Sequence, residues 1–275
     1  MNNFLKIRQH KYLLIGSVSL FLLTLLQSCQ KNTVQTLPNR NFQLVWSDNF
    51  DSLKLDASKW SFDIGSGGWG NSELETYTNS SANLSMDGNG HLMIKALQPS
   101  SGVYTSARIK SKNLFSQTYG RIEASIKTPY GPGIWPAFWM LGSNIDTVGW
   151  PQCGEIDIME QQGQAPNINH GSVHGPGYSG ASAITKAYQL PNGRFDTDYH
   201  LYAIEWGPDY IDFFVDNFLY EVITPGDVTG NWVFNHPFYI LLNVAVGGTY
   251  VGWPTSSTPF PQTMYVDYVK VYNQL

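Results

Sequence analysis

One segment of this chain alternates apolar and polar residues with a period of two. The stretch RIEASIKT begins at Arg121 and places Ile122, Ala124 and Ile126 on one parity, with mostly polar side chains on the other. This spacing is typical of a β-strand that has one buried face. Further runs that predict strands lie at residues 44–46, 92–97, 199–206 and 264–272.

Helical periodicity is absent from the sequence after residue 28, and turn residues separate the predicted strands. The 26 glycines and 15 prolines suit many short strands that are joined by tight turns. Asp216 and Asn217 stand between the runs YIDFFV and FLYEVI and predict a two-residue hairpin. The sequence therefore predicts an all-β fold of two packed antiparallel sheets.

Residues 1–28 have the pattern of an export signal. A basic stretch precedes an apolar run from Tyr12 to Leu26, as in a secretory signal peptide rather than a membrane span. The run ends in LLQSCQ, which resembles the bacterial lipoprotein signal, so Cys29 is predicted to carry a lipid. We expect an exported protein that is lipid-anchored to a bacterial membrane, in the periplasm or at the cell surface. Ordinary secretion after nearby cleavage is the alternative.

Residues 29–40 are polar and predict a short tether. Residues 41–275 are then long enough for one large domain with its own hydrophobic core. We expect this domain to be a monomer that meets the membrane only through its lipid anchor.

The charge balance argues against nucleic acid as a partner. The chain has 16 basic and 21 acidic residues, a net charge of −5, and residues 1–28 hold three of the basic residues and no acidic one. The charge without them is therefore −8, and an acidic protein does not attract a polyanion. Apart from Cys29, the chain has one cysteine, Cys153, which we interpret as a buried structural thiol rather than a nucleophile.

The segment GEIDIMEQQ carries three carboxylates among apolar neighbours. Glu155 and Asp157 share one face of a strand, whereas a regular strand would turn Glu160 to the other face. A β-bulge around Ile158 and Met159 would restore the phase, and bulges of this kind are frequent beside active sites. We therefore predict that all three acids line one surface.

Such an arrangement suits the chemistry of glycoside hydrolysis. In the retaining form, two carboxyl groups lie about 5–5.5 Å apart; one attacks the sugar carbon and the other protonates the leaving oxygen. Repulsion among three carboxylates raises at least one pKa, so that one glutamate stays protonated near neutral pH. A concave sheet would expose the acids in a groove for an extended polymer. A solvated acidic face and a metal site built of oxygens are the alternatives.

Aromatic and polar residues elsewhere could complete such a groove. GIWPAFWML places Trp135 and Trp139 four residues apart, where indole rings could stack on sugars; core packing is the alternative. Asn71 lies in the glycine-rich segment GWGNSELETYT, which is otherwise merely a loop. Arg108 could bind sugar hydroxyls, pair with one of the acids, or be a surface charge. His174 could lie on an adjacent antiparallel strand near the acid/base Glu160, or be a buried structural histidine.

These segments, in this order and with the closing FYILLNVAVGG and MYVDYVKVY, resemble glycoside hydrolase family 16. The resemblance covers residues 42–272 and is strongest to the laminarinase branch, whose members are endo-acting β-1,3-glucanases. It implies a β-jelly-roll of two curved antiparallel sheets with a concave cleft, and a retaining double displacement that needs no cofactor.

The resemblance also assigns roles to residues. Glu155 matches the nucleophile, Glu160 the general acid/base and Asp157 the residue that tunes the nucleophile. Contacts with the polysaccharide are implied for Trp135, Trp139, Asn71, Arg108, His174 and Trp253.

Many family members carry a structural calcium ion on the convex face. Asp267 matches one of its ligands. Asn49 stands where related sequences commonly have a glutamate, so one charged ligand is replaced by a neutral one, which weakens calcium binding.

The leading hypothesis is thus a lipid-anchored endo-β-1,3-glucanase acting on laminarin-type glucan. One alternative keeps the enzyme and changes the polymer to mixed-linkage β-1,3-1,4-glucan or to a galactan such as agar or carrageenan. Another is a surface glycan-binding protein without activity. The acidic chain shows no basic cluster beside these motifs, which disfavours a sulfated polymer.

Overall fold

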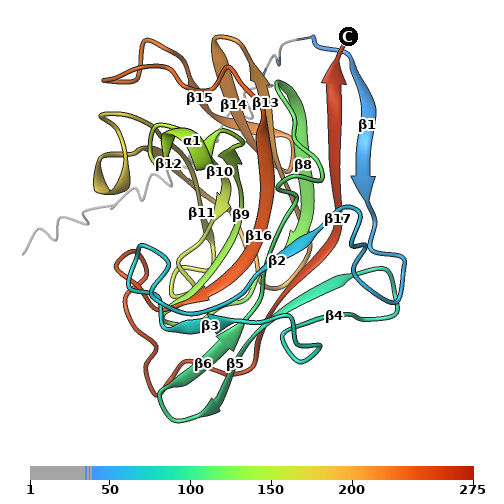
Figure 1. The fold of residues 1–275 in the computed structure, drawn as a ribbon, viewed down its shortest axis with the longest axis vertical. Helices are drawn as coiled ribbons and strands as arrows, with labels where there is room; N and C mark the ends of the chain where they lie inside the picture. The colour runs from blue at the N-terminus through green and yellow to red at the C-terminus, as the bar shows by residue number, and fades with distance from the viewer. Residues whose placement is uncertain (1–34, 36, 38) are drawn as a thin grey trace, which may run out of the picture. The chain divides into compact units, whose positions relative to one another are not determined.

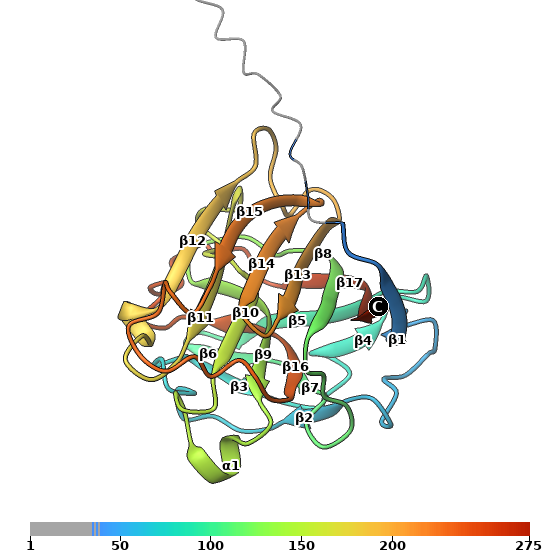
Figure 2. The ribbon, with the colours of Figure 1, turned by 90° about the horizontal axis from the view of Figure 1, so that it is seen from above.

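The computed structural model describes residues 35, 37 and 39–275, and their regular secondary structure is almost entirely β-strand (Figure 1). The strands are β1 (Phe42–Asp48), β2 (Ser61–Asp63), β3 (Glu75–Tyr77), β4 (Leu84–Met86), β5 (Leu92–Ser100), β6 (Val103–Ser106), β7 (Arg108–Lys110), β8 (Gly120–Lys127), β9 (Ile134–Gly142), β10 (Glu155–Glu160), β11 (Ile168–His174), β12 (Ile184–Gln189), β13 (His200–Gly207), β14 (Tyr210–Val215), β15 (Phe218–Ile223), β16 (Phe238–Val246) and β17 (Gln262–Gln274). Two short helical turns, α1 (Ile145–Val148) and the 3-10 turn η1 (Gly180–Ser182), lie at the periphery (Figure 2). The described residues contain no helix long and apolar enough to cross a membrane.

The strands form two sheets. The seven-stranded sheet has the order β12-β11-β10-β9-β16-β7-β2. The ten-stranded sheet has the order β15-β14-β13-β8-β17-β5-β6-β3, with β1 paired to β17 and β4 to β5. Neighbouring strands are antiparallel except for β3 and β6. The predicted all-β fold of two antiparallel sheets is therefore confirmed.

The alternating segment behaves as its periodicity predicts. In β8 the side chains of Ile122, Ala124 and Ile126 are fully buried, because one face of the strand packs against the other sheet. The hairpin is also confirmed: Asp216 and Asn217 join β14 to β15 with φ values of 50° and 63°. Positive φ at both central residues is the requirement of the hairpin turn that matches the twist of the strands.

The hydrophobic core lies between the two sheets. It joins buried side chains of β8 and β17 in one sheet to those of β10 and β16 in the other. Burying these apolar side chains is the main stabilising contribution to such a fold. Since the core uses one face of each sheet, the opposite face of the seven-stranded sheet remains available for a cleft.

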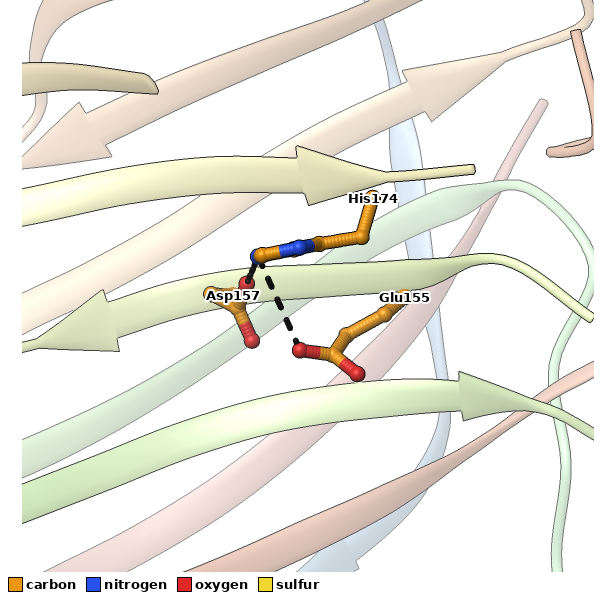
Figure 3. A group of neighbouring side chains, drawn as sticks. All are labelled: Glu155, Asp157 and His174. Carbon is orange, nitrogen blue, oxygen red and sulfur yellow. Dashed lines mark ion pairs between the residues drawn. The ribbon is translucent and has the colours of Figure 1, made fainter. Parts of the chain in front are cut away.

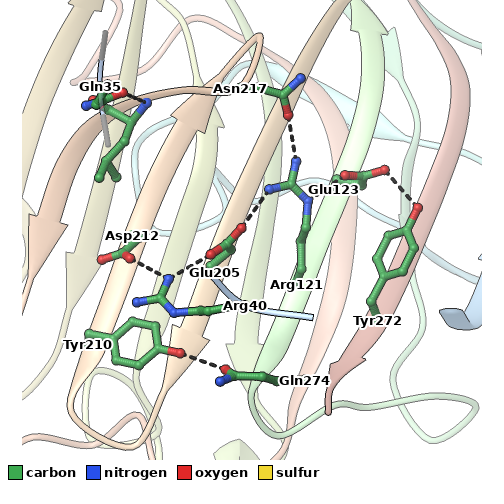
Figure 4. A network of polar contacts seen from close by, with 11 residues as sticks. Gln35, Arg40, Arg121, Glu123, Glu205, Tyr210, Asp212, Asn217, Tyr272 and Gln274 are labelled. Atoms are coloured by element: carbon green, nitrogen blue, oxygen red, sulfur yellow. Dashed lines mark hydrogen bonds and ion pairs between the residues drawn. The ribbon is translucent and has the colours of Figure 1, made fainter. Parts of the chain in front are cut away.

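The outer face of the ten-stranded sheet carries a network of ion pairs (Figure 4). Arg40 Nη1 lies 2.7 Å from both Glu205 and Asp212, and its guanidinium stacks 4.0 Å from the Tyr210 ring centroid. The side chain of Gln35 also exchanges two hydrogen bonds with the backbone of Leu219. The end of the segment that the sequence assigns to a tether therefore contacts the domain.

Candidate active site

Strand β10 carries the three acids, and its pairing is irregular between them. Two consecutive residues of β9, Trp139 and Phe138, pair with Asp157 and Met159, so Ile158 has no partner on that strand. The register with β11 shifts at the same place. The predicted bulge is thus present, and it returns the last acid of the motif to the face of the first two.

Burial separates the two faces of β10. The three apolar residues between the acids are fully buried in the core. Glu155 and Glu160 are half-buried, and Asp157 is buried with 2% of its surface exposed. A solvated acidic face is therefore excluded, because these carboxyl groups are largely removed from water.

The acids line a cavity of about 660 Å³. Six strands of the seven-stranded sheet contribute to it, namely β7, β9, β10, β11, β12 and β16. The lining residues that bear polar or aromatic groups include Trp69, Asn71, Glu73, Arg108, Trp135, Trp139, Trp150, Glu155, Asp157, Glu160, His174, Asn243 and Tyr250. This cavity is the predicted cleft, and aromatic walls with a few convergent polar groups are typical of ligand sites.

His174 stands beside the first two acids (Figure 3). Its Nε2 lies 3.1 Å from Asp157 Oδ2 and 3.7 Å from Glu155 Oε1. Its Nδ1 accepts the backbone N–H of Gly180 at 3.1 Å. A neutral imidazole has one N–H, so the proton of His174 lies on Nε2 and faces the two carboxyl groups.

The strand register adds detail to one expectation. His174 lies on the adjacent antiparallel strand, as the sequence predicts, where it pairs directly with Glu155 and also lowers the pKa of Glu160. His170 is the residue that pairs with Glu160. The reason is the register between β10 and β11, which sequence spacing alone does not determine.

Trp150 provides a further contact to the first acid. Its indole Nε1–H donates to Glu155 Oε2 at 2.8 Å. A donor at this distance stabilises the ionised carboxylate. Trp150 was not predicted from the sequence, although it stands only five residues before Glu155.

Glu160 has different neighbours. The indole Nε1–H of Trp135 donates to Glu160 Oε1 at 3.0 Å. Tyr250 packs against Trp135 with ring centroids 4.9 Å apart, and its hydroxyl lies 3.0 Å from His170 Nδ1. Tyr250 was also missed from the sequence, because its loop is brought to the cleft only by the fold.

Burial and mutual repulsion raise the pKa values of all three acids. Burial, together with the charge of Asp157, raises the pKa of Glu155 to about 8, against the opposing effects of His174 and Trp150. Burial also raises the pKa of Asp157 to about 8. The pKa of Glu160 is raised well above its ordinary value, by burial and then by Asp157. The three groups therefore cannot all be ionised at neutral pH, and Glu160 keeps its proton.

Glu155 and Asp157 shift each other's pKa. The charge of Asp157 raises the pKa of Glu155, whereas hydrogen bonding to Glu155 lowers that of Asp157. Two carboxylates this close repel each other, which disfavours ionising both at once. Trp150 and His174 lower the pKa of Glu155 and so favour its ionised form.

The two predicted tryptophans lie on one face of β9, half-buried in the cleft. Trp139 donates its indole N–H to Asn243 Oδ1 at 2.7 Å. The guanidinium of Arg108 lies 4.7 Å from the ring of Trp139 and 5.2 Å from that of Trp69. Arg108 forms its ion pair with Asp63, at 2.9 Å, and with none of the three acids. Arg108 therefore belongs to the cleft wall. It is neither a surface charge nor a direct partner of the three acids, which were two of the roles considered from the sequence.

Asn71 lines the cleft and donates to Glu73 Oε1 at 3.2 Å. Trp253 is different. Its side chain is 52% exposed, and among the described residues it is absent from the set that lines the cavity. Its loop passes close to the cleft, since a Cβ on Gly247 would lie 3.0 Å from the Trp253 ring. Trp253 thus lies on a loop near the cleft, as predicted, and its contact with the polysaccharide stays a prediction.

Only one group of three metal-ligating side chains converges within the described residues, and it is Glu155, Asp157 and His174. The predicted calcium ligand Asp267 lies elsewhere, on β17. It is the extra residue of a bulge between Val266 and Tyr268 and is half-buried. The predicted lipidation site, Cys29, and the signal peptide lie outside the described residues. Cys153 is fully buried, and burial raises its pKa to about 11.

Comparison with known proteins identifies this type of site. Residues 66–270 match the model of glycosyl hydrolases family 16. The chain is 41% identical to the beta-glucanase of Rhodothermus marinus over 247 residues, which cover 84% of this chain and 85% of that protein.

Solved structures agree with this match. The catalytic domain of an endo-1,3-beta-glucanase (laminarinase) from Thermotoga petrophila superimposes with a TM-score of 0.82 at 46% identity, over 86% of this chain and 99% of that one. The endo-beta-1,3-glucanase of Pyrococcus furiosus gives a TM-score of 0.82 at 45% identity, over 87% and 97%.

Proposed function

Because this chain belongs to glycosyl hydrolases family 16, we propose that it is an endo-acting glycosidase that cleaves β-1,3-glucan with retention. Its activity is that of a glycoside hydrolase, and catalysis needs no cofactor. The observation that carries the proposal is the bulged strand β10, which places three carboxyl groups in one cleft with raised pKa values. The β-1,3 linkage is supported by the likeness to laminarinases.

Each acid has a role in the proposed double displacement. Glu155, ionised and held by Trp150, attacks the anomeric carbon and forms the glycosyl-enzyme bond. Glu160 gives its proton to the leaving glycosidic oxygen and then takes one from the water that breaks the intermediate. Asp157 lies beside Glu155 and tunes the pKa of this nucleophile through its charge.

The rest of the cleft binds the polymer. Trp135 and Trp139 offer flat apolar faces for pyranose rings, while Asn71 and Arg108 supply polar contacts. His174 faces the two carboxyl groups at the nucleophile end. Trp253 contacts the polymer beside the cavity, because about half of its surface is exposed there.

The test is release of reducing ends from laminarin, barley mixed-linkage glucan, agarose and carrageenan by the domain from residue 31 onward, with Glu160→Ala in parallel. Activity on laminarin that is lost in the variant supports the proposal. Faster cleavage of one of the other polymers would change the substrate and keep the chemistry. Retention of the protein in a laminarin gel without hydrolysis would instead indicate a glycan-binding protein.

A structural calcium ion at Asp267 remains part of the proposal. The half-buried carboxylate at a bulge offers oxygen ligands of the kind that calcium prefers. If calcium binds there, it raises Tm in wild-type protein and has no such effect in Asp267→Ala. Activity after chelation should persist below the melting temperature, because the cleft chemistry does not use the ion.

We further propose that Cys29 anchors the protein by a lipid to a bacterial membrane and that the domain is monomeric. The support is the pattern LLQSCQ after an apolar run. Cys29→Ala in the full chain should abolish incorporation of labelled fatty acid and release the protein from the membrane fraction. Light scattering of the soluble domain gives its mass.

A further inference from the structure

Beneath one end of the cleft lies a second pair of acids, Glu73 and Glu75, that the proposed mechanism does not use. Glu75, on β3, is fully buried. Its Oε2 accepts the backbone N–H of Val246 at 2.7 Å. Its Oε1 is also buried, and no donor among the described residues reaches it. A buried carboxylate oxygen without a donor is costly, so this oxygen requires another explanation.

The carboxyl group of Glu73, two residues earlier, acts on Glu75 through its charge and through side-chain hydrogen bonding, both of which raise the pKa of Glu75. Since a carboxylate has no hydrogen to donate, one of the two must be protonated. Glu73 lines the cleft and already accepts two hydrogen bonds, from Asn71 at 3.2 Å and from Tyr77 at 3.3 Å. The proton therefore belongs on Glu75, and Glu73 is the acceptor.

A chain of hydrogen bonds runs from the cleft wall to the same carboxylate. An indole N–H can only donate, so Trp139 fixes the amide of Asn243 with its oxygen toward the indole. The amide nitrogen then donates to the Tyr77 oxygen at 3.1 Å. The Tyr77 hydroxyl is left to donate to Glu73. Each donor in the series thus points toward Glu73.

The electrostatics agree with this geometry. Burial, followed by the charge and hydrogen bond of Glu73, raises the pKa of Glu75 to about 9. Tyr77 on the same strand interacts with both glutamates, by charge and by hydrogen bonding to Glu75, and the charge of Arg108 on β7, which is itself paired with Asp63, acts on Tyr77. The pKa of Tyr77 is raised well above its ordinary value by burial and by the two glutamates, so its hydroxyl keeps its proton.

We propose that Glu75 is a positioning residue that acts as a neutral acid. It donates a hydrogen bond to Glu73 and so holds that carboxylate in place. Glu73 is in turn the end point of the hydrogen-bond chain that orients Trp139 in the cleft. Glu75 touches no substrate and takes no part in bond breaking. The proposal rests on the cleft being the glucan site, and it predicts an effect on binding more than on turnover.

Two substitutions distinguish this role from simple packing. Glu75→Gln keeps a donor for Glu73 and an acceptor for Val246, so its KM for laminarin should stay within about twofold of wild type. Glu75→Ala removes both, and KM should rise about five- to tenfold with a smaller change in kcat, the scale expected for one buried hydrogen bond. Tyr77→Phe breaks the chain in its middle and should raise KM similarly. A KM rise in Glu75→Gln as large as in Glu75→Ala would overturn the proposal.

A spectroscopic measurement needs no substrate. The indole N–H resonance of Trp139, assigned with Trp139→Phe, should move in Glu75→Ala and in Tyr77→Phe and stay in place in Glu75→Gln. An unmoved resonance in both of the first two variants would contradict the proposed chain.

The pH dependence of unfolding tests the neutral state of Glu75 directly. A carboxyl group with a raised pKa binds a proton on folding, so its contribution to stability falls as pH rises from its ordinary value of 4.5 to about 9. In Glu75→Gln, the free energy of unfolding should fall less steeply with pH over this range, because the amide does not titrate. Glu221→Gln, at a buried acid outside the cleft with a pKa raised to about 7, is the matched control and should leave KM unchanged.

These readouts separate the two proposals. If the wild-type protein releases nothing from laminarin, the proposed substrate fails, while the resonance and unfolding experiments still test Glu75. If laminarin is cleaved and the unfolding slope of Glu75→Gln equals that of wild type, Glu75 is not a neutral acid and the positioning role is wrong.

Discussion

The two faces of this protein treat their acidic residues in opposite ways. On the outer face of the ten-stranded sheet, Arg40 pairs with Glu205 and Asp212, while Arg121 pairs with Glu205 and Glu123. In the cleft of the seven-stranded sheet, the three acids of β10 form no ion pair with a lysine or arginine among the described residues. Their polar neighbours are a histidine and indole N–H groups.

The presence or absence of a paired arginine distinguishes acids that stabilise the fold from acids that react. An arginine beside a carboxylate favours the ionised form and makes it a poor proton donor. Burial raises the pKa of Asp212 too, but Arg40 opposes that rise. The cleft acids have no such paired cation, and their pKa values rise strongly, as a general acid requires. No lysine or arginine of the described residues thus pairs directly with the groups that must exchange protons, and Arg108 in the cleft wall pairs with Asp63 instead.

The largest expected effect is at the nucleophile. Glu155→Gln keeps the shape of the side chain and removes the attacking oxygen anion, so kcat on laminarin should fall roughly 10⁴-fold or more. Glu205→Gln is the matched control on the outer face and should leave kcat unchanged. Hydrolysis at the wild-type rate by Glu155→Gln would show that this cleft acid is no more necessary for activity than an acid of the outer face.

The next effect is at the acid/base. Glu160→Ala should lower kcat on laminarin about 10²- to 10⁴-fold, the range for general acid catalysis. The loss should be much smaller on an aryl glucoside with an acidic phenol as leaving group, because that group departs without protonation. If kcat falls equally on both substrates, a residue other than Glu160 protonates the leaving oxygen.

On the outer face the expected effect is on stability. Arg40→Ala leaves Glu205 and Asp212 partly buried without their shared cation, which should cost about 2 kcal/mol of unfolding free energy. For a domain of this size the corresponding fall in Tm is about 4–8 °C. Below the melting temperature, the kcat of folded Arg40→Ala should match that of wild type. A large loss of kcat would show that the ion pairs of the outer face also affect the chemistry in the cleft.

The smallest effect concerns the pH profile. Trp150→Phe keeps the aromatic ring and removes the N–H that favours ionised Glu155. The pKa of Glu155 should therefore rise, and the acidic limb of kcat/KM should move upward by about one pH unit. Trp135→Phe removes the N–H at Glu160 and should move the basic limb instead. An acidic limb that stays in place in Trp150→Phe would show that His174 alone stabilises the charge.

Patterns of residues close along the chain were enough to predict the centre of the site. The face on which a strand residue lies depends on its own position in the alternation, so RIEASIKT predicted the buried side of β8. The spacing of the three acids likewise required a bulge, and the bulge lies where the motif predicts it. Trp135 and Trp139 follow the same rule on β9.

Contacts between distant segments followed no such rule. His174 pairs with Glu155 rather than with Glu160, because strand register decides which residues oppose each other. The ion partner of Arg108 is Asp63 on the neighbouring strand and none of the catalytic acids, while its contact with a sugar stays a prediction. Trp253 is half-exposed and is absent from the residues that line the cavity, so its contact with substrate also stays a prediction.

The sequence by itself therefore determined the all-β class, the bulged acid strand and the family to which it belongs, because these depend on residues that are close along the chain. Only the tertiary structure decided that Trp150 holds Glu155, that Tyr250 reaches the cleft, and that Glu75 lies buried against Glu73. Those contacts depend on how strands far apart in sequence are aligned and on which groups lose their water, and both are properties of the folded chain as a whole.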